Sequence, residues 1–126
     1  MDTARKRALL YKHIRSGMRS DRESAVNRIL GREKLPTVGQ VDYYEVLGKY
    51  LTSEDALYAF QRVVDDLSQG LLHGIFCVLD GATAVTDFYQ PALIDRDTKQ
   101  DLAPEDSTYH DEFFDYLLDQ GDELGV

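Results

Sequence analysis

A histidine and a cysteine four residues apart are the side chains in this sequence best placed to do chemistry together. On a helix, His73 and Cys77 would share a face, where an imidazole beside a thiol can bind a metal ion or activate a thiolate. A zinc site needs three or four ligands, and the other positions on that face, Asp66 and Gly70, supply at most one more. We therefore interpret His73 as a hydrogen-bonded residue in or beside the core and Cys77 as a packing residue.

Three aspartates have a spacing related to that of a calcium-binding loop. Asp95, Asp97 and Asp101 could offer hard oxygen ligands at alternating positions. Lys99 stands where a further ligand belongs, however, and no glycine follows at the sharp turn. The pattern is more typical of a solvated turn.

The last predicted helix carries a second acidic group. His110 follows Asp106 by four residues, and Asp115 follows Asp111 by four, so these side chains could face a metal ion together. Such pairs are common on exposed acidic helices, and we interpret them as a solvated face. The sequence also contains no glycine-rich phosphate loop, no nucleophile elbow and no H-E-x-x-H motif. We therefore expect no enzyme activity, no cofactor and no metal ion.

Charge is divided unevenly along the chain, which has a formal net charge of -9. Residues 1–36 hold ten lysines or arginines against four acids, a local net charge of +6. Residues 37–126 hold four basic residues against nineteen acids, a local net charge of -15. This division leads to two functional hypotheses and to a structural alternative.

The first hypothesis is a small acidic inhibitor or immunity-type protein that binds a basic protein partner. A negative surface complements such a partner and speeds their association. We place this surface on the last helix and the turn before it, on five acidic residues: Asp106, Asp111, Glu112, Asp115 and Asp119.

The second hypothesis is a nucleic-acid-binding regulator whose basic N-terminal helices form a helix-turn-helix. Its phosphate contacts would come from Arg5, Lys6, Lys12 and Arg15. The whole-chain pI of about 4.6 argues against it. In the structural alternative, basic and acidic segments simply pair with each other, within one domain or across a homodimer.

Length and hydropathy define the framework for these residues. We expect one domain over residues 1–126, with a basic helical pair at 1–36 and an acidic helical body with a minor β element at 37–126. The apolar run after Arg7 is too short for an export signal, and the longest apolar stretch, residues 71–79, is too short to cross a membrane. The single cysteine fits a reducing compartment, so we expect a cytoplasmic location.

The predicted fold class is mainly α, with about five helices around a long central helix at residues 52–80 and a small β-hairpin near 91–103. Apolar spacing and helix-ending glycines predict the first helix at 3–17 and a second at 20–30, where Ser20 and Glu23 form a capping box and Gly31 ends the helix. A second capping box at Thr37–Gln40 opens a third helix.

The central helix is predicted from an apolar stripe that keeps steps of three and four residues: Leu57, Phe60, Val64, Leu67, Leu71, Ile75 and Val78. We expect this stripe to pack the core, although the chain has no sustained heptad. A helix that ends near Gly70, followed by a strand at 71–79, is the alternative. Residues 95–99 are predicted to form a hairpin turn, and Pro104 to open the final helix. The apolar face of that helix would consist of Tyr109, Phe113, Tyr116 and Leu117, with Phe114 and Leu118 adjoining.

Overall fold

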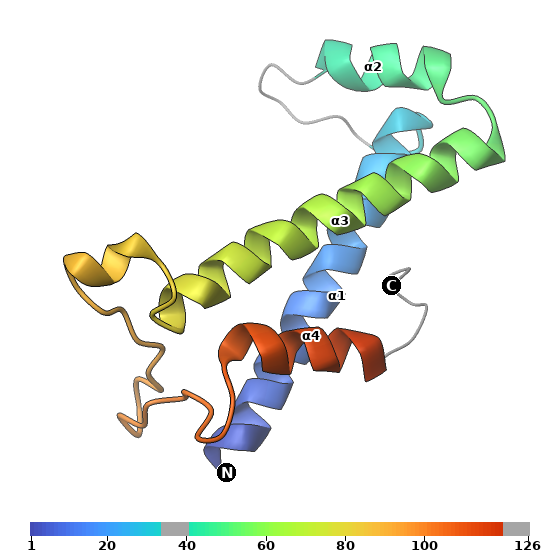
Figure 1. Ribbon diagram of the computed structural model, residues 1–126. Helices are drawn as coiled ribbons and strands as arrows, with labels where there is room; N and C mark the ends of the chain where they lie inside the picture. The colour runs from blue at the N-terminus through green and yellow to red at the C-terminus, as the bar shows by residue number, and fades with distance from the viewer. Residues whose placement is uncertain (34–40, 120–126) are drawn as a thin grey trace.

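The computed structural model describes residues 1–33 and 41–119, and this part of the protein is mainly α-helical (Figure 1). Its elements in chain order are α1 (Thr3–Ile29), α2 (Val41–Tyr50), α3 (Glu54–Leu79), the short 3-10 helix η1 (Ala84–Asp87) and α4 (Tyr109–Asp119). The mainly α prediction is confirmed, with four described α-helices instead of about five. None of the described helices is long and apolar enough to cross a membrane.

One continuous helix, α1, replaces the two helices predicted between residues 3 and 30, so the predicted helix-turn-helix is wrong. The Asp2 side chain caps its first turn. A glycine inside a helix costs only about 1 kcal/mol relative to alanine, and α1 runs through Gly17 because packing continues beyond it, where Met18 is buried in the core. The predicted glycine stop is confirmed, since Gly31 follows the helix with a φ of +72°.

The central helix predicted at residues 52–80 is confirmed as α3. Ser53 begins it, and the Ser53 hydroxyl accepts the backbone N–H of Ala56 at 3.1 Å. The helix continues unbroken through residues 71–79, so the alternative strand there is wrong. Figure 1 shows α3 running from the end next to α2 to the end next to η1, across α1.

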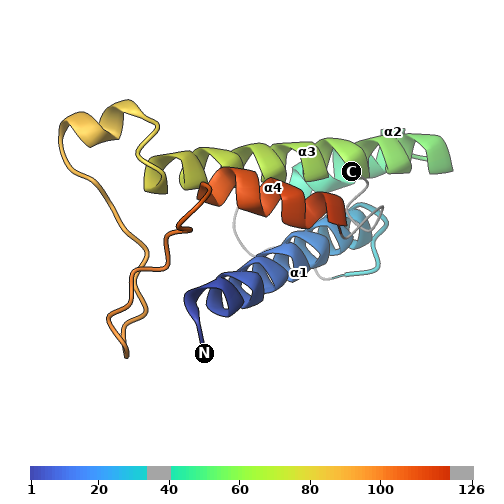
Figure 2. The same cartoon turned by 60° about the horizontal axis from the view of Figure 1, so that its bottom comes forward.

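The core lies where α1, α3 and α4 meet, and each of these helices contacts the other two (Figure 2). Aromatic rings make most of it. Tyr11 of α1 meets Phe76 of α3 edge-on, with ring centroids 5.9 Å apart, and Phe113 of α4 at 5.4 Å. The buried cluster consists of Tyr11, Met18, Phe76, Tyr109, Phe113 and Leu117. The apolar face predicted for the last helix is therefore the one that packs.

The face that α3 buries is not the one predicted. Leu67 and Leu71, in the middle of the predicted core stripe, are each 67% exposed. The helix turns Asp65 and Phe76 inward instead, each 3% exposed. Asp65 Oδ2 pairs with a guanidinium nitrogen of Arg22 on α1 at 3.0 Å, and Phe76 enters the aromatic core. These two contacts together fix the orientation of the helix.

The predicted hairpin near residues 91–103 is reduced to a single antiparallel bridge between Ile94 and Asp101, and the described residues form no strand. The turn at residues 95–99 is in the predicted place, and Lys99 closes it with a φ of 63°. Pro91 and Pro104 stand on either side, and because proline has no backbone N–H to donate, the pairing cannot extend past them.

Helix α2 packs against the second half of α1. Gly48 permits this close approach, because a Cβ at that position would lie 2.7 Å from the carbonyl oxygen of Ile29. The Arg28 guanidinium lies over the Tyr44 ring, 5.8 Å from its centroid. The capping box predicted at Thr37–Gln40 lies outside the described residues.

Candidate functional site

Three of the predicted partner-binding acids form a row along the outer side of α4. Asp111, Asp115 and Asp119 are exposed and stand four residues apart, which places them one above another on the helix. Among residues 1–33 and 41–119, the ion pairs of Lys6, Arg7 and Arg22 are with other acids and not with this α4 carboxylate row. Its closest basic group is the His110 ring, whose Nε2 lies 3.6 Å from Asp111 Oδ1.

Two apolar side chains lie beside this row on α4. Phe114 is 52% exposed and Leu118 is 49% exposed, although both are large and could have packed in the core. They stand four residues apart, so they too share one side of the helix. The outer surface of α4 thus combines negative charge with an exposed apolar strip.

An open groove of about 520 Å³ separates α4 from α3 next to this strip. The rings of His73 and His110 meet edge-on across it, with centroids 5.2 Å apart. Most of the side chains that line the α3–α4 groove are apolar, including Leu67, Leu71, Phe113, Phe114 and Leu117, and Asp66 adds a carboxylate. Pockets of this kind usually receive an apolar group.

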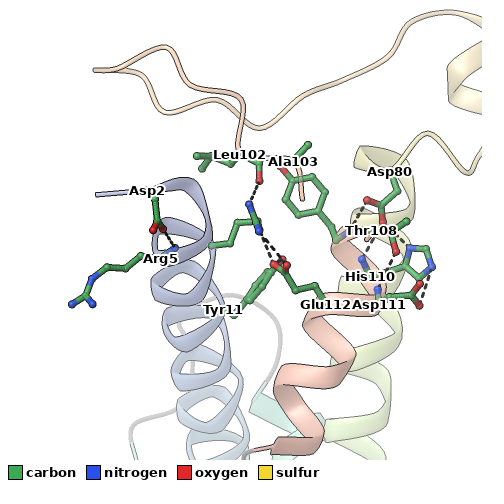
Figure 3. Close-up of polar contacts among 12 residues, drawn as sticks. Asp2, Arg5, Tyr11, Asp80, Leu102, Ala103, Thr108, His110, Asp111 and Glu112 are labelled. Atoms are coloured by element: carbon green, nitrogen blue, oxygen red, sulfur yellow. Dashed lines mark hydrogen bonds and ion pairs between the residues drawn. The ribbon is translucent and has the colours of Figure 1, made fainter. Parts of the chain in front are cut away.

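A residue from the end of α3 sets where α4 begins. Both carboxylate oxygens of Asp80 accept backbone N–H groups of α4, from Tyr109 at 2.6 Å and from His110 at 3.0 Å. The His110 ring Nδ1 also lies 2.6 Å from Asp80 (Figure 3). Helix α4 therefore begins at Tyr109, and the start predicted at Pro104 is wrong by five residues, because the N–H groups are capped from a distant position.

Glu112, the fourth predicted partner-binding acid, faces the inside of the molecule. Its carboxylate pairs with both Nε and a terminal nitrogen of Arg7, at 2.6 and 3.2 Å, and accepts the Tyr11 hydroxyl at 2.8 Å. Figure 3 shows Glu112 and Tyr11 pointing toward each other between α1 and α4. The hydrogen bond to Glu112 raises the pKa of Arg7, and burial raises the pKa of Tyr11. Glu112 is thus engaged within the chain.

Asp106, the fifth predicted acid, is exposed but stands apart from the row. It precedes α4 and lines a recess of about 310 Å³ together with Asp2 and Arg7 from the start of α1. The five acids predicted as one surface are therefore divided between three places. Only Asp111, Asp115 and Asp119 are brought together.

Lys6, Arg7 and Arg22 of α1 pair with acids elsewhere in the same chain. Lys6 Nζ lies 2.6 Å from Asp95 and also donates to Gln100 and Thr98. The Lys6 contact, with two backbone N–H groups, holds the pKa of Asp95 well below its usual range. With the Arg7–Glu112 and Arg22–Asp65 pairs, three ion pairs between described residues join the basic to the acidic segment.

Of the residues predicted to contact nucleic acid, the structure leaves only two exposed. Arg5 and Lys12 face solvent, whereas Arg15 is half-buried and Lys6 is engaged as described. Because α1 is continuous, it also offers no recognition helix set off by a turn.

The histidine, cysteine and aspartates considered for metal binding make local contacts within the chain. Cys77 Sγ lies 3.4 Å from His73 Nε2, as expected for two residues one turn apart, and His73 is exposed at the groove. The Asp95 carboxylate accepts the N–H groups of Asp97 and Thr98, and Asp101 accepts that of Ala103, so these oxygens hold a turn. The described residues contain no group of three histidines, cysteines or acids placed to hold a metal ion.

Comparison with protein-family models, with curated proteins and with solved structures gave no match. Any functional conclusion therefore depends on the geometry of this chain.

Sequence reasoning missed two features of the site. Phe114 and Leu118 are recognisable as apolar, but nothing in the sequence shows that they stay outside the core. The capping role of Asp80 had no signal either, because it acts on residues 29 and 30 positions later.

Proposed function

We propose that this chain is a non-enzymatic protein-interaction domain, of the kind of a small acidic inhibitor or immunity-type protein, that binds a basic partner through the outer surface of α4. The observation that carries the proposal is the α4 carboxylate row beside Phe114, Leu118 and the α3–α4 groove. A cytoplasmic location belongs to the same proposal.

The placement of the row is costly for the isolated chain. Like charges four residues apart on a helix repel each other. In addition, Asp115 and Asp119 lie toward the C-terminal end of α4, where the helix dipole is negative, and the last turn has no basic residue. Arrangements that lower the stability of a helix in this way are expected at functional sites. A lysine- or arginine-rich partner would remove both penalties.

The apolar part of the surface specifies the partner further. A groove lined by leucine and phenylalanine can receive an apolar side chain of the partner, and such buried anchors supply most of the binding energy of an interface. The charges at its rim guide association. The partner segment that fits is a basic one with a bulky apolar side chain that enters the α3–α4 groove. A helix with basic residues beside an apolar stripe has this chemistry.

The proposal is tested by capture from an extract of the source cells at moderate salt, with three versions of the full chain as bait. The first is the natural sequence. The second neutralises the row with Asp111→Asn, Asp115→Asn and Asp119→Asn. The third is a matched control that neutralises three exposed acids on other elements, Glu45→Gln, Asp87→Asn and Asp97→Asn. Retained proteins are identified by mass.

We expect the natural and control baits to retain the same basic protein in stoichiometric amount, and the row variant to lose it. Raising the salt concentration should release it, since exposed charges are screened within about 10 Å at 0.1 M salt. Equal retention by the row variant would contradict the proposed surface. Retention of nucleic acid alone, removed by nuclease, would contradict the proposed partner class.

A further inference from the structure

The middle of the apolar stripe that the sequence predicts as the core of the molecule lies on the open side of α3. Leu67, Leu71 and Ile75 of the stripe are exposed, as is Val63 beside it, whereas the other members of the stripe are half-buried. With Gly74 in place of Ile75, the spacing alternates between three and four residues from Leu57 to Val78. We call these residues the α3 seam: Leu57, Phe60, Val64, Leu67, Leu71, Gly74 and Val78. Heptads of this length are typical of helices that pair with another helix.

The positions beside the seam indicate what kind of helix can cover it. None of the residues on its two flanks is charged: Gln61, Ser68 and Ile75 on one side, and Val63, Gly70 and Cys77 on the other. Two copies of a chain with a net charge of -9 repel each other, and an uncharged contact surface avoids adding close carboxylate pairs to that repulsion. A basic partner, in contrast, would find no carboxylate at these positions. The α3 seam therefore suits a second copy better than it suits the partner of α4.

Two glycines in the middle of α3 also favour contact with another helix. Gly70 and Gly74 stand one turn apart in the helix interior, where glycine weakens a helix relative to alanine. Within one copy they have no packing reason, because a Cβ at either position would meet nothing within 4 Å. Close approach of another backbone is the ordinary reason for glycine at such positions.

We propose that α3 packs against α3 of a second copy of this chain, and that the two helices cross at Gly70 and Gly74. A two-fold axis at the crossing would present the same surface of both copies to each other. At 1.5 Å per residue, the seam from Leu57 to Val78 is about 32 Å long. This dimer differs from the charge-paired homodimer considered from sequence, because the basic and acidic segments are already joined by ion pairs within one copy.

The oligomeric state of the full chain tests the proposal by sedimentation equilibrium. We expect twice the chain mass for the natural sequence and a single mass for Leu67→Glu with Leu71→Glu. Both side chains are exposed within one copy, so the helical circular dichroism of the variant should be retained. The matched control, Phe114→Glu with Leu118→Glu on α4, should remain a dimer.

A second pair of variants separates association from folding. If α3 faced only solvent, Gly70→Ala with Gly74→Ala would raise the melting temperature, because alanine favours the helix and the space is open. In the dimer, the added methyl groups hold the helices apart, and we expect roughly tenfold weaker association. A single mass for the natural chain at all concentrations would overturn the proposal. A dimer that survives Leu67→Glu with Leu71→Glu would overturn the assigned surface.

This result is distinguishable from that of the partner proposal. Leu67, Gly70 and Leu71 also line the α3–α4 groove, so a second copy on α3 and a partner side chain in the groove would compete for these residues. The carboxylate row lies on α4 alone, and its neutralisation should leave the dimer intact. Either proposal can therefore fail without the other.

Discussion

The guanidinium of Arg7 and the carboxylate of Glu112 form a two-point ion pair between the first and last helices, with N–O distances of 2.6 and 3.2 Å. A terminal nitrogen of Arg7 also donates to the Leu102 carbonyl at 3.1 Å. This one side chain therefore joins α1 to α4, across 105 residues of sequence, and also to the segment before α4. On α4, Glu112 thus contacts α1, whereas its neighbour Asp111 is exposed.

Breaking this pair should destabilise the fold. We expect Glu112→Gln to lower the free energy of unfolding by about 2–3 kcal/mol, between the values for a charged hydrogen bond and for a broken buried pair. Arg7→Met should cost less, because the Glu112 carboxylate is partly exposed and keeps the hydrogen bond from Tyr11. Urea unfolding of both single variants and the double variant gives their coupling energy. Additive losses would show that the two residues do not act together.

Two buried tyrosines should respond in opposite directions to the loss of a hydroxyl group. The Tyr11 hydroxyl donates to Glu112, so Tyr11→Phe should lower stability by about 1.5–3 kcal/mol. The Tyr109 hydroxyl is buried without a partner among the described residues, so Tyr109→Phe should be neutral or stabilising. Each variant is a control for the other in thermal unfolding. Equal losses would contradict the assigned hydrogen bond.

Tyr109 also predicts a fall in stability at alkaline pH. Burial raises the pKa of Tyr109 to about 12, whereas an unfolded tyrosine ionises near pH 10. The unfolded state therefore releases this proton first, and stability decreases as the pH rises from about 10 toward 12. Tyr109→Phe should reduce the slope of this part of the pH profile of urea unfolding without abolishing it, because burial also raises the pKa of Tyr11. An unchanged slope would argue that other groups cause it.

The lowered pKa of Asp95 predicts a loss of stability as the pH falls into the acidic range. Its pKa is lowered by the contact with Lys6, so its stabilising effect is complete above the unfolded value near pH 4 and is lost as the pH falls below that value. Asp95→Asn keeps an oxygen for the N–H groups of Asp97 and Thr98 but removes the charge. The variant should be less stable than the natural chain at pH 7, with a smaller difference at pH 3. Asp97→Asn, next to it and exposed, should show no difference at either pH.

The distant cap of α4 can be tested at Asp80. Asp80→Ala removes the acceptor of two backbone N–H groups and should cost about 1–2 kcal/mol, the upper range for helix caps. Asp80→Asn should cost less, because one carbonyl oxygen remains. Amide hydrogen exchange should show the loss at the start of α4. Exchange that increases equally along the whole chain would indicate a general loss of stability instead.

Local signals in the sequence were enough to predict the helical class, the central helix and the glycine that ends α1. Ser53 and Gly31 act through groups within a few residues, and such effects can be read from neighbouring positions. The break at Ser20 was predicted by the same logic and is wrong, because packing around Met18 outweighs a local capping box.

The orientation of α3 and the division of the acids could not be predicted in this way. Two faces of α3 could have been buried, and contacts with Arg22 and the aromatic core decide between them. Similarly, Glu112 and Asp111 are adjacent in sequence, and only the position of Arg7 shows that one faces inward and the other outward. These choices depend on residues far apart in the chain.

The rate at which the captured basic partner associates with the immobilised chain tests the central claim most directly. We predict that neutralising Asp111, Asp115 and Asp119 lowers the association rate constant roughly tenfold at low salt, and that the difference shrinks as salt is added, since exposed interface charges act mainly on this rate. The control variant, neutralised at Glu45, Asp87 and Asp97, should associate at the natural rate. Equal rate constants for the natural chain and the row variant at low salt would contradict the claim that α4 receives the partner.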